Sequence, residues 1–200
     1  MKNEFVLAWH FSHNEILGYN DGRKIVAGER HIVNCVPKCC QIGLHGSIKA
    51  LDALNYAPGL IISRVLLTGN IDKQKDKLAA TCRQYLWVAN ASEIIVDFAR
   101  WCANETAHYA SRDIPVASSA ASYARYASAA SYAARYAARY AARYDSAASY
   151  AISAAIYASR AISAASSASF AASYAKQNIK LEEMLNTLAP KDYDETIYLQ

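Results

Sequence analysis

The chain has no long apolar run. No stretch of about 20 apolar residues, the length of a membrane-spanning helix, occurs in its sequence. The apolar run nearest the start, from Phe5 to Trp9, is too short and wrongly flanked for a signal peptide. We therefore expect a cytoplasmic protein with no membrane partner.

Cysteine pairing of the kind that holds a metal is also missing. The five cysteines are odd in number and irregularly spaced, and no two of them form a Cys-x-x-Cys pair. Zinc prefers thiolate and imidazole ligands, and several lie close together in the sequence, at His31, Cys35, Cys39, Cys40 and His45. The spacing argues against a site, because adjacent Cys side chains diverge. We expect reduced thiols, no metal and no cofactor.

Residues 116–176 contain no Gly, Pro, Cys, His or Trp. Their 61 positions hold 26 Ala, 14 Ser, 9 Tyr and 5 Arg, whereas residues 1–115 use every residue type. The same 61 positions carry six basic side chains and one acidic one. This contrast predicts an α+β domain over 1–112, an Ala-rich helical repeat with an amphipathic helix over 113–189, and an acidic tail over 190–200.

The predicted N-terminal domain is a small mixed sheet with two helices. Residues Glu4 to Phe11 and Lys24 to Ala27 are expected to form a hairpin, because Tyr19-Asn20-Asp21-Gly22 supplies a turn between them. Runs of apolar and β-branched residues predict further strands at 60–67 and 82–88. Helical spacing of apolar residues predicts helices at 47–56, capped by Ser47, and at 93–109.

A tetrad of one Tyr, two Ala and one Arg dominates the C-terminal part. Since Ala is the best helix former and a poor strand former, this part is predicted to be an all-α Ala/Ser/Tyr/Arg-rich repeat. Tyr and Arg share one side of such a helix, and paired Ala residues on the other side let helices pack closely into a homo-oligomer. The predicted interaction surface comprises Tyr132, Arg135, Tyr136, Arg139, Tyr140, Arg143 and Tyr144.

A glycine-containing turn carries the most distinctive local signal. Gly43 and Gly46 flank His45 and let the backbone turn tightly, and Ser47 is expected to open a helix whose free N–H groups hold an anion. With Tyr56 at the helix end, this predicts a pocket for a phosphate or nucleotide. The Gly-x-His-x-Ser turn is similar to the NAD-binding edge of ADP-ribosyltransferases. Glu105, the candidate for their catalytic carboxylate, falls within a predicted helix.

Several distinctive motifs lie between residues 40 and 105. They are Cys40-Gln-Ile-Gly43-Leu-His45-Gly-Ser47, Leu51-Asp-Ala-Leu-Asn-Tyr56-Ala-Pro-Gly59, Asp76-Lys77-Leu78, Arg83 and Phe98-Ala-Arg-Trp101. This region resembles a family of uncharacterised phage and prophage proteins. The resemblance implies a phage-type origin, and hence the host-cell cytoplasm, with no established activity. We take as candidate ligand-binding residues His45, Ser47, Tyr56, Lys77 and Arg83, and assign no catalytic residue.

Three functional hypotheses follow from the sequence. The leading one is a non-enzymatic phage-type binding protein that acts against host defence by sequestering a nucleotide-derived signal or a host partner, an analogy of origin alone. The second is an NAD- or nucleotide-processing enzyme of ADP-ribosyltransferase type, with His45 and Tyr56 in its pocket. The third is a nucleic-acid-binding protein whose tetrad tyrosines stack on bases while its arginines contact phosphates.

Overall fold

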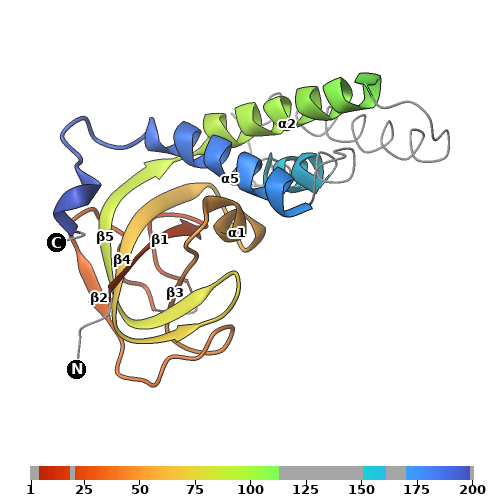
Figure 1. The fold of residues 1–200 in the computed structure, drawn as a ribbon. Helices are drawn as coiled ribbons and strands as arrows, with labels where there is room; N and C mark the ends of the chain where they lie inside the picture. The colour runs from red at the N-terminus through yellow and green to blue at the C-terminus, as the bar shows by residue number, and fades with distance from the viewer. Residues whose placement is uncertain (1–4, 19–20, 113–150, 161–169, 199–200) are drawn as a thin grey trace. The chain divides into compact units, whose positions relative to one another are not determined.

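The structure is a computed structural model of the chain, and it describes residues 5–18, 21–112, 151–160 and 170–198 (Figure 1). The chain divides into two compact units. One comprises Met1–Asn90 together with Leu185–Gln200, and the other comprises Ala91–Met184. None of the described helices is long and apolar enough to cross a membrane.

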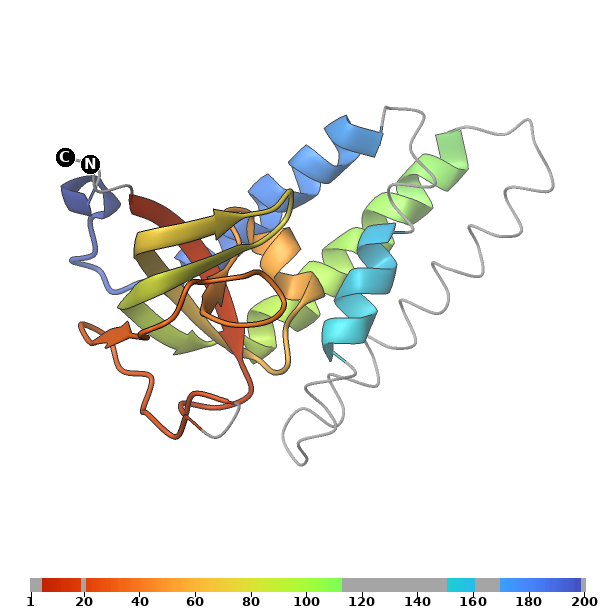
Figure 2. The same ribbon diagram turned by 90° about the horizontal axis from the view of Figure 1, so that it is seen from below.

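The first unit is built on a five-stranded sheet. Its strands are β1 (Phe5–Ser12), β2 (Arg30–Ile32), β3 (Leu44–Gly46), β4 (Ile61–Lys73) and β5 (Leu78–Asn90). The strand order is β1-β4-β5-β2, β3 pairs with the start of β5, and every one of these pairs is antiparallel. Strands β4 and β5 have 13 residues each and form a long curved hairpin (Figures 1 and 2).

Strands β1 and β3 close this sheet on itself. The Trp9 N–H donates to the Ser47 carbonyl at 2.7 Å, and the Ser47 N–H donates back to the Trp9 carbonyl at 2.9 Å. Because β3 also pairs with β5, the path β1-β4-β5-β3 returns to β1. Register shifts after Arg64 and after Thr68 bend the long strands, as such closure requires.

The core of the first unit lies on one face of the curled sheet. Ala8, Val65 and Tyr85 are register partners across β1, β4 and β5, and all three are fully buried. They form one cluster with Ile25, Leu67, Leu78 and Ala80. Burial of each large apolar side chain contributes about 1.5–3 kcal/mol. Gly46 keeps this face closely packed, because a Cβ there would lie 3.1 Å from the Cβ of Ala8 and would push the two apart by a few tenths of an ångström.

Helix α1 (Ala50–Asn55) is shorter than the helix predicted over 47–56. Its N-cap residue is Lys49, and no side chain caps it. Ser47 is instead buried in the backbone bridge to Trp9. Ser47 therefore closes the sheet and does not open the helix, so the prediction that it caps the helix is wrong, while ligand binding at Ser47 stays a prediction.

The second unit contains the helix predicted over 93–109. Helix α2 (Ser92–Arg112) confirms it, with a stripe of fully buried residues at intervals of three and four positions: Ile95, Phe98, Ala99 and Cys102. The Phe98 and Trp101 rings stack with centroids 5.9 Å apart. The apolar stripe predicts this helix correctly because apolar residues at helical spacing form one buried face.

Two C-terminal segments are described as helical. One covers residues 151–160, where Ala151, Ala154, Ala155 and Ala158 are buried at helical spacing. The other is α5 (Phe170–Asn186), which contains the predicted amphipathic stripe with Leu181 and Leu185 fully buried. Within the second unit, Ser159 donates a hydrogen bond to the buried side chain of Gln177 on α5.

The predicted fold class is wrong in two respects. The sheet is antiparallel, whereas a mixed sheet was expected. The C-terminal part is not an all-α repeat, because its described helices are few and residues 187–198 belong to the first unit, where they form only the short 3₁₀ helix η1 (Glu195–Tyr198). Alanine content gave helix propensity, but Pro190 and the aromatic residues of the tail direct the last residues onto the sheet unit.

The predicted hairpin between β1 and Lys24–Ala27 is also wrong. Strand β1 pairs with β4, 49 to 63 positions later in the chain, and Lys24 forms only an isolated bridge with Ile16. A turn signal establishes that the chain reverses but not which strand it pairs with. The predicted domain limits at 112 and 189 stay predictions, since most of the chain between them lies outside the described residues.

Candidate functional site

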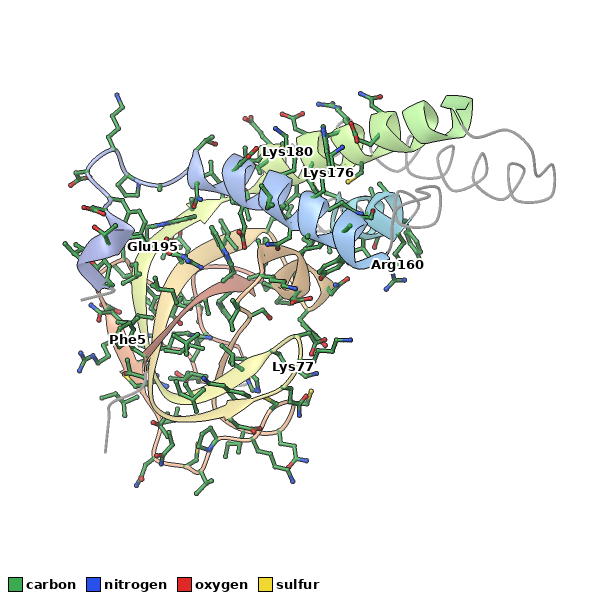
Figure 3. The ribbon with its side chains drawn as sticks, in the orientation of Figure 1. Phe5, Lys77, Arg160, Lys176, Lys180 and Glu195 are labelled. Carbon is green, nitrogen blue, oxygen red and sulfur yellow. The ribbon has the colours of Figure 1, made fainter. Side chains whose placement is uncertain are left out.

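Three of the predicted ligand-binding residues lie around the turn between β4 and β5. Lys77 is in that turn (Figure 3), Tyr56 follows α1 as its C-cap residue, and His45 lies in β3 beside the start of β5. The Lys77 ammonium lies 4.5 Å from the centroid of the Tyr56 ring and donates to the Tyr56 hydroxyl at 3.3 Å. Tyr56 and Lys77, 21 positions apart in the sequence, therefore share one surface.

A carboxylate joins this surface at Asp76. The Tyr56 hydroxyl donates a short hydrogen bond to it, and that bond is the main cause that raises the pKa of Tyr56 above its usual value. The pKa of Lys77 is also raised, first by its hydrogen bond to the Cys40 side chain and then by the one to Tyr56. Lys77 is therefore a permanent cation at neutral pH, partly offset by Asp76.

His45 is held in its neutral form. Its Nε2 accepts the backbone N–H of Cys40 at 3.2 Å, so this nitrogen carries no proton. Burial lowers the pKa of His45, and the positive charges of Arg83 and Lys77 lower it further. Both of these cations disfavour protonation of the imidazole.

The loop that presents Cys40 has a strained backbone. Cys40 has a φ of 66°, and it is the one non-glycine residue with a positive φ in the described part of the chain. The neighbouring Cys39 fixes the loop to β4, because its N–H donates to the Asp72 carboxylate at 2.7 Å. That contact is the main cause that lowers the pKa of Asp72. All five cysteines are free thiols.

Arg83 lies next to this surface, on the buried face of the curled sheet. Only 2% of the residue is exposed. Its Nη1 donates to the His45 carbonyl at 2.7 Å, while its Nε and Nη2 both donate to the Tyr85 hydroxyl at 3.1 and 2.6 Å. The Tyr85 hydroxyl in turn lies 3.4 Å from Nδ1 of the buried His31. Burial lowers the pKa of Arg83, as expected for a cation taken out of water.

Within the described ranges, no carboxylate forms an ion pair with Arg83. A guanidinium has five N–H donors, and the hydrogen bonds of Arg83 use three of them. Buried charges in proteins are normally paired, because an unpaired one costs several kcal/mol or more of desolvation. Arg83 therefore adds positive potential beside His45 and Lys77, which the carboxylate of Asp21 offsets only in part.

Three residues of this site escaped the sequence-based prediction. They are Cys40, Asp76 and Tyr85, although the first two lie within the motifs around His45 and Lys77. Tyr85 lies two residues after Arg83 on the same strand, and successive side chains of a strand alternate between faces. That spacing is the signal that could have paired Tyr85 with Arg83.

The other candidate residues lie elsewhere. Glu105, the candidate catalytic carboxylate, is on α2 in the second compact unit, where it forms an ion pair with Lys176 of α5 at 2.6 Å. The seven Tyr and Arg residues of the predicted interaction surface, from Tyr132 to Tyr144, lie outside the described residues. In the described part of the chain, no group of three or more His, Cys, Asp or Glu side chains is arranged to hold a metal ion.

Comparison with protein-family models, curated proteins and solved structures found no match to this chain. The resemblance to phage and prophage proteins therefore stays a prediction.

Proposed function

We propose that this chain is a binding protein for a small phosphate-bearing molecule of nucleotide type, held at the surface formed by His45, Tyr56 and Lys77. The observation that carries the proposal is Arg83, a buried guanidinium that has no carboxylate partner in the described residues and that contacts the His45 carbonyl. An anion bound at this surface would compensate that charge.

Electrostatics favours an anion here. Lys77 and Arg83 are both cationic, and His45 is neutral with its Nε2 occupied by a backbone donor. Two unit charges 4 Å apart attract by about 4 kcal/mol at the effective dielectric of a protein surface. A phosphate near Lys77 therefore gains from both cations, and the gain decreases as salt screens the exposed one.

The aromatic ring of Tyr56 suits the rest of a nucleotide. Half of this residue is exposed, at 50%, and the Lys77 ammonium lies against its ring. Stacking of a base on an exposed aromatic side chain contributes about 1–3 kcal/mol. Ring and ammonium together match a ligand with a flat base and a phosphate.

Asp76 opposes an anion at the same surface. Its carboxylate accepts from the Tyr56 hydroxyl and offsets part of the Lys77 charge. Its removal by Asp76→Asn should therefore strengthen phosphate binding, whereas Lys77→Met should weaken it. Lys75 lies in the same turn and is exposed, so Lys75→Met is the matched control.

The test is calorimetric titration of the full chain and these three variants with ADP-ribose, NAD and cyclic nucleotides. We expect at least one ligand to bind wild type, about tenfold weaker binding by Lys77→Met, tighter binding by Asp76→Asn and no change with Lys75→Met. Equal affinity of Lys75→Met and Lys77→Met, or no binding by any ligand, would contradict the proposal. Release of nicotinamide from NAD would favour the enzyme hypothesis.

The wider role is proposed on the resemblance alone. A phage protein that binds a nucleotide-derived signal would act against host defence by lowering the free concentration of that signal in the host cytoplasm. Five free thiols agree with a reducing compartment. The tetrad surface keeps its proposed roles in self-association and nucleic-acid binding, for which a salt-dependent shift of DNA or RNA is the test.

A further inference from the structure

Arg64 lies among aromatic rings on the face of the sheet opposite the core cluster. It is the register partner of Trp9 on β1 and of Trp87 on β5, so the three side chains share that face. The Arg64 guanidinium lies 4.6 Å from the centroid of the Trp9 ring. The Trp9 and Trp87 rings meet edge to face with centroids 5.7 Å apart. We call these three residues the Arg64 cradle.

The C-terminal tail places a carboxylate in this cradle. Arg64 donates from Nε to Glu195 at 3.2 Å and makes a second, short hydrogen bond to Glu195 from Nη2. The Tyr193 ring lies edge to face against Trp87, with centroids 6.3 Å apart. The contact is therefore made by an aromatic residue and an acidic residue two positions later.

The cradle has more hydrogen-bond donors than the tail satisfies. Arg64 and Trp87 are 9% and 1% exposed, yet Nη1 of Arg64 and Nε1 of Trp87 have no partner in the described residues. A buried donor without an acceptor costs about 1–3 kcal/mol. Both unpartnered donors are on adjacent register partners, so a ligand with additional acceptor atoms would satisfy them where Glu195 alone does not.

Side chains alone hold the tail on the sheet. The backbone hydrogen bonds of residues 188–193 are local, from Leu188 to Leu185, from Ala189 to Asn186 and from Tyr193 to Pro190. Across the described residues, no backbone hydrogen bond joins residues 190–198 to a strand. The tail is therefore displaceable without breaking the sheet.

We propose that the Arg64 cradle is a binding site for an acidic peptide segment of the pattern aromatic-x-acidic, and that the chain's own tail occupies it as an internal ligand. The carboxylate of the incoming segment replaces that of Glu195 on Arg64, and its aromatic residue replaces Tyr193 against Trp87. Its remaining carbonyl or carboxylate oxygens accept from the two unpartnered donors. This site is separate from the nucleotide surface, because Glu195 and Lys77 lie at opposite ends of the sheet unit (Figure 3).

The test uses the full chain and a labelled peptide with the sequence of residues 190–198, followed by fluorescence anisotropy. In wild type, the attached tail competes at an effective concentration on the order of millimolar, so peptide binding is weak. Glu195→Gln removes that competition without changing the cradle, and we expect at least tenfold tighter peptide binding. Asp192→Asn, an equal charge change at an exposed tail position, should bind the peptide as weakly as wild type does.

A second peptide, with Gln in place of its Glu, tests the role of the carboxylate. We expect its binding to Glu195→Gln protein to be lost. Equal binding of the two peptides, or equal affinity of wild type and Glu195→Gln protein, would overturn the proposal. The variant Arg64→Lys keeps the charge but loses the two-pronged geometry, and combined with Glu195→Gln it should bind the peptide about tenfold more weakly than Glu195→Gln alone. Unchanged binding by this double variant would also overturn the proposal.

Discussion

Replacement of Arg83 by Met tests whether Arg83 contributes mainly to ligand binding or mainly to the stability of the fold. Arg83 is buried beside Tyr85 and His45, and no carboxylate of the described residues pairs with it. Its removal therefore leaves no buried counter-charge behind. That asymmetry distinguishes it from one partner of a buried ion pair, whose loss typically costs about 3–5 kcal/mol.

The expected change in unfolding free energy is small. Arg83→Met loses three hydrogen bonds from a charged donor, each worth about 1.5–3 kcal/mol. It regains the several kcal/mol spent on desolvation of the guanidinium and about 1.5–3 kcal/mol from burial of the Met side chain. These contributions cancel to within about 2 kcal/mol, whereas binding of a phosphate-bearing ligand should fall about tenfold or more.

Urea denaturation followed by tryptophan fluorescence measures the change in unfolding free energy, because Trp9 and Trp87 lie in the same compact unit as Arg83. Arg64→Met is the matched control, since its removal breaks an ion pair with Glu195 and a contact with the Trp9 ring. We expect it to lose about 2–4 kcal/mol. A greater loss of stability by Arg83→Met than by Arg64→Met, with ligand binding intact, would show that Arg83 serves the fold and not the ligand.

Three further predictions concern stability. Gly59→Ala should lose about 1–3 kcal/mol in urea denaturation, because its Cβ would lie 2.5 Å from the His13 Cα and backbone must move. Phe98→Ala should lose about 3–5 kcal/mol, measured by the fluorescence of the stacked Trp101 ring, since Phe98 is fully buried. Acid should destabilise the fold. Burial lowers the pKa of His10, His31 and His45 below 6.5, so the unfolded chain binds more protons than the folded one at acid pH. Their contribution is complete above pH 6.5 and falls below it by up to about 4 kcal/mol per pH unit, which denaturation at pH 5 and pH 7 checks.

The sequence predicted individual elements better than their partners. Strand β1 and helix α2 came from local periodicity, which depends only on one face being buried. The β1–β4 pairing and the Trp9–Ser47 closure join residues far apart in the chain, and no local pattern encodes them. Ser47 illustrates the difference, because its place before a helix predicts a cap, whereas its backbone closes the sheet.

Four of the five candidate ligand-binding residues lie near one another, and their role in ligand binding stays a prediction. His45, Tyr56, Lys77 and Arg83 do lie close together or in direct contact. The burial of Arg83 could not be predicted from the sequence, because charged residues are rarely buried. The Arg64 cradle was missed altogether, since it depends on the pairing of β1, β4 and β5, and its contact with Glu195 depends on the tail returning to the sheet.

The proposed function depends on phosphate binding at the surface around His45 and Lys77. Histidine ring resonances, followed by NMR during titration of the full chain with inorganic pyrophosphate, test it most directly. The His45 ring resonances should move in a saturable manner in wild type and in Lys75→Met, and should move far less in Lys77→Met. Unmoved His45 resonances in wild type, or equal movement in the two lysine variants, would contradict it.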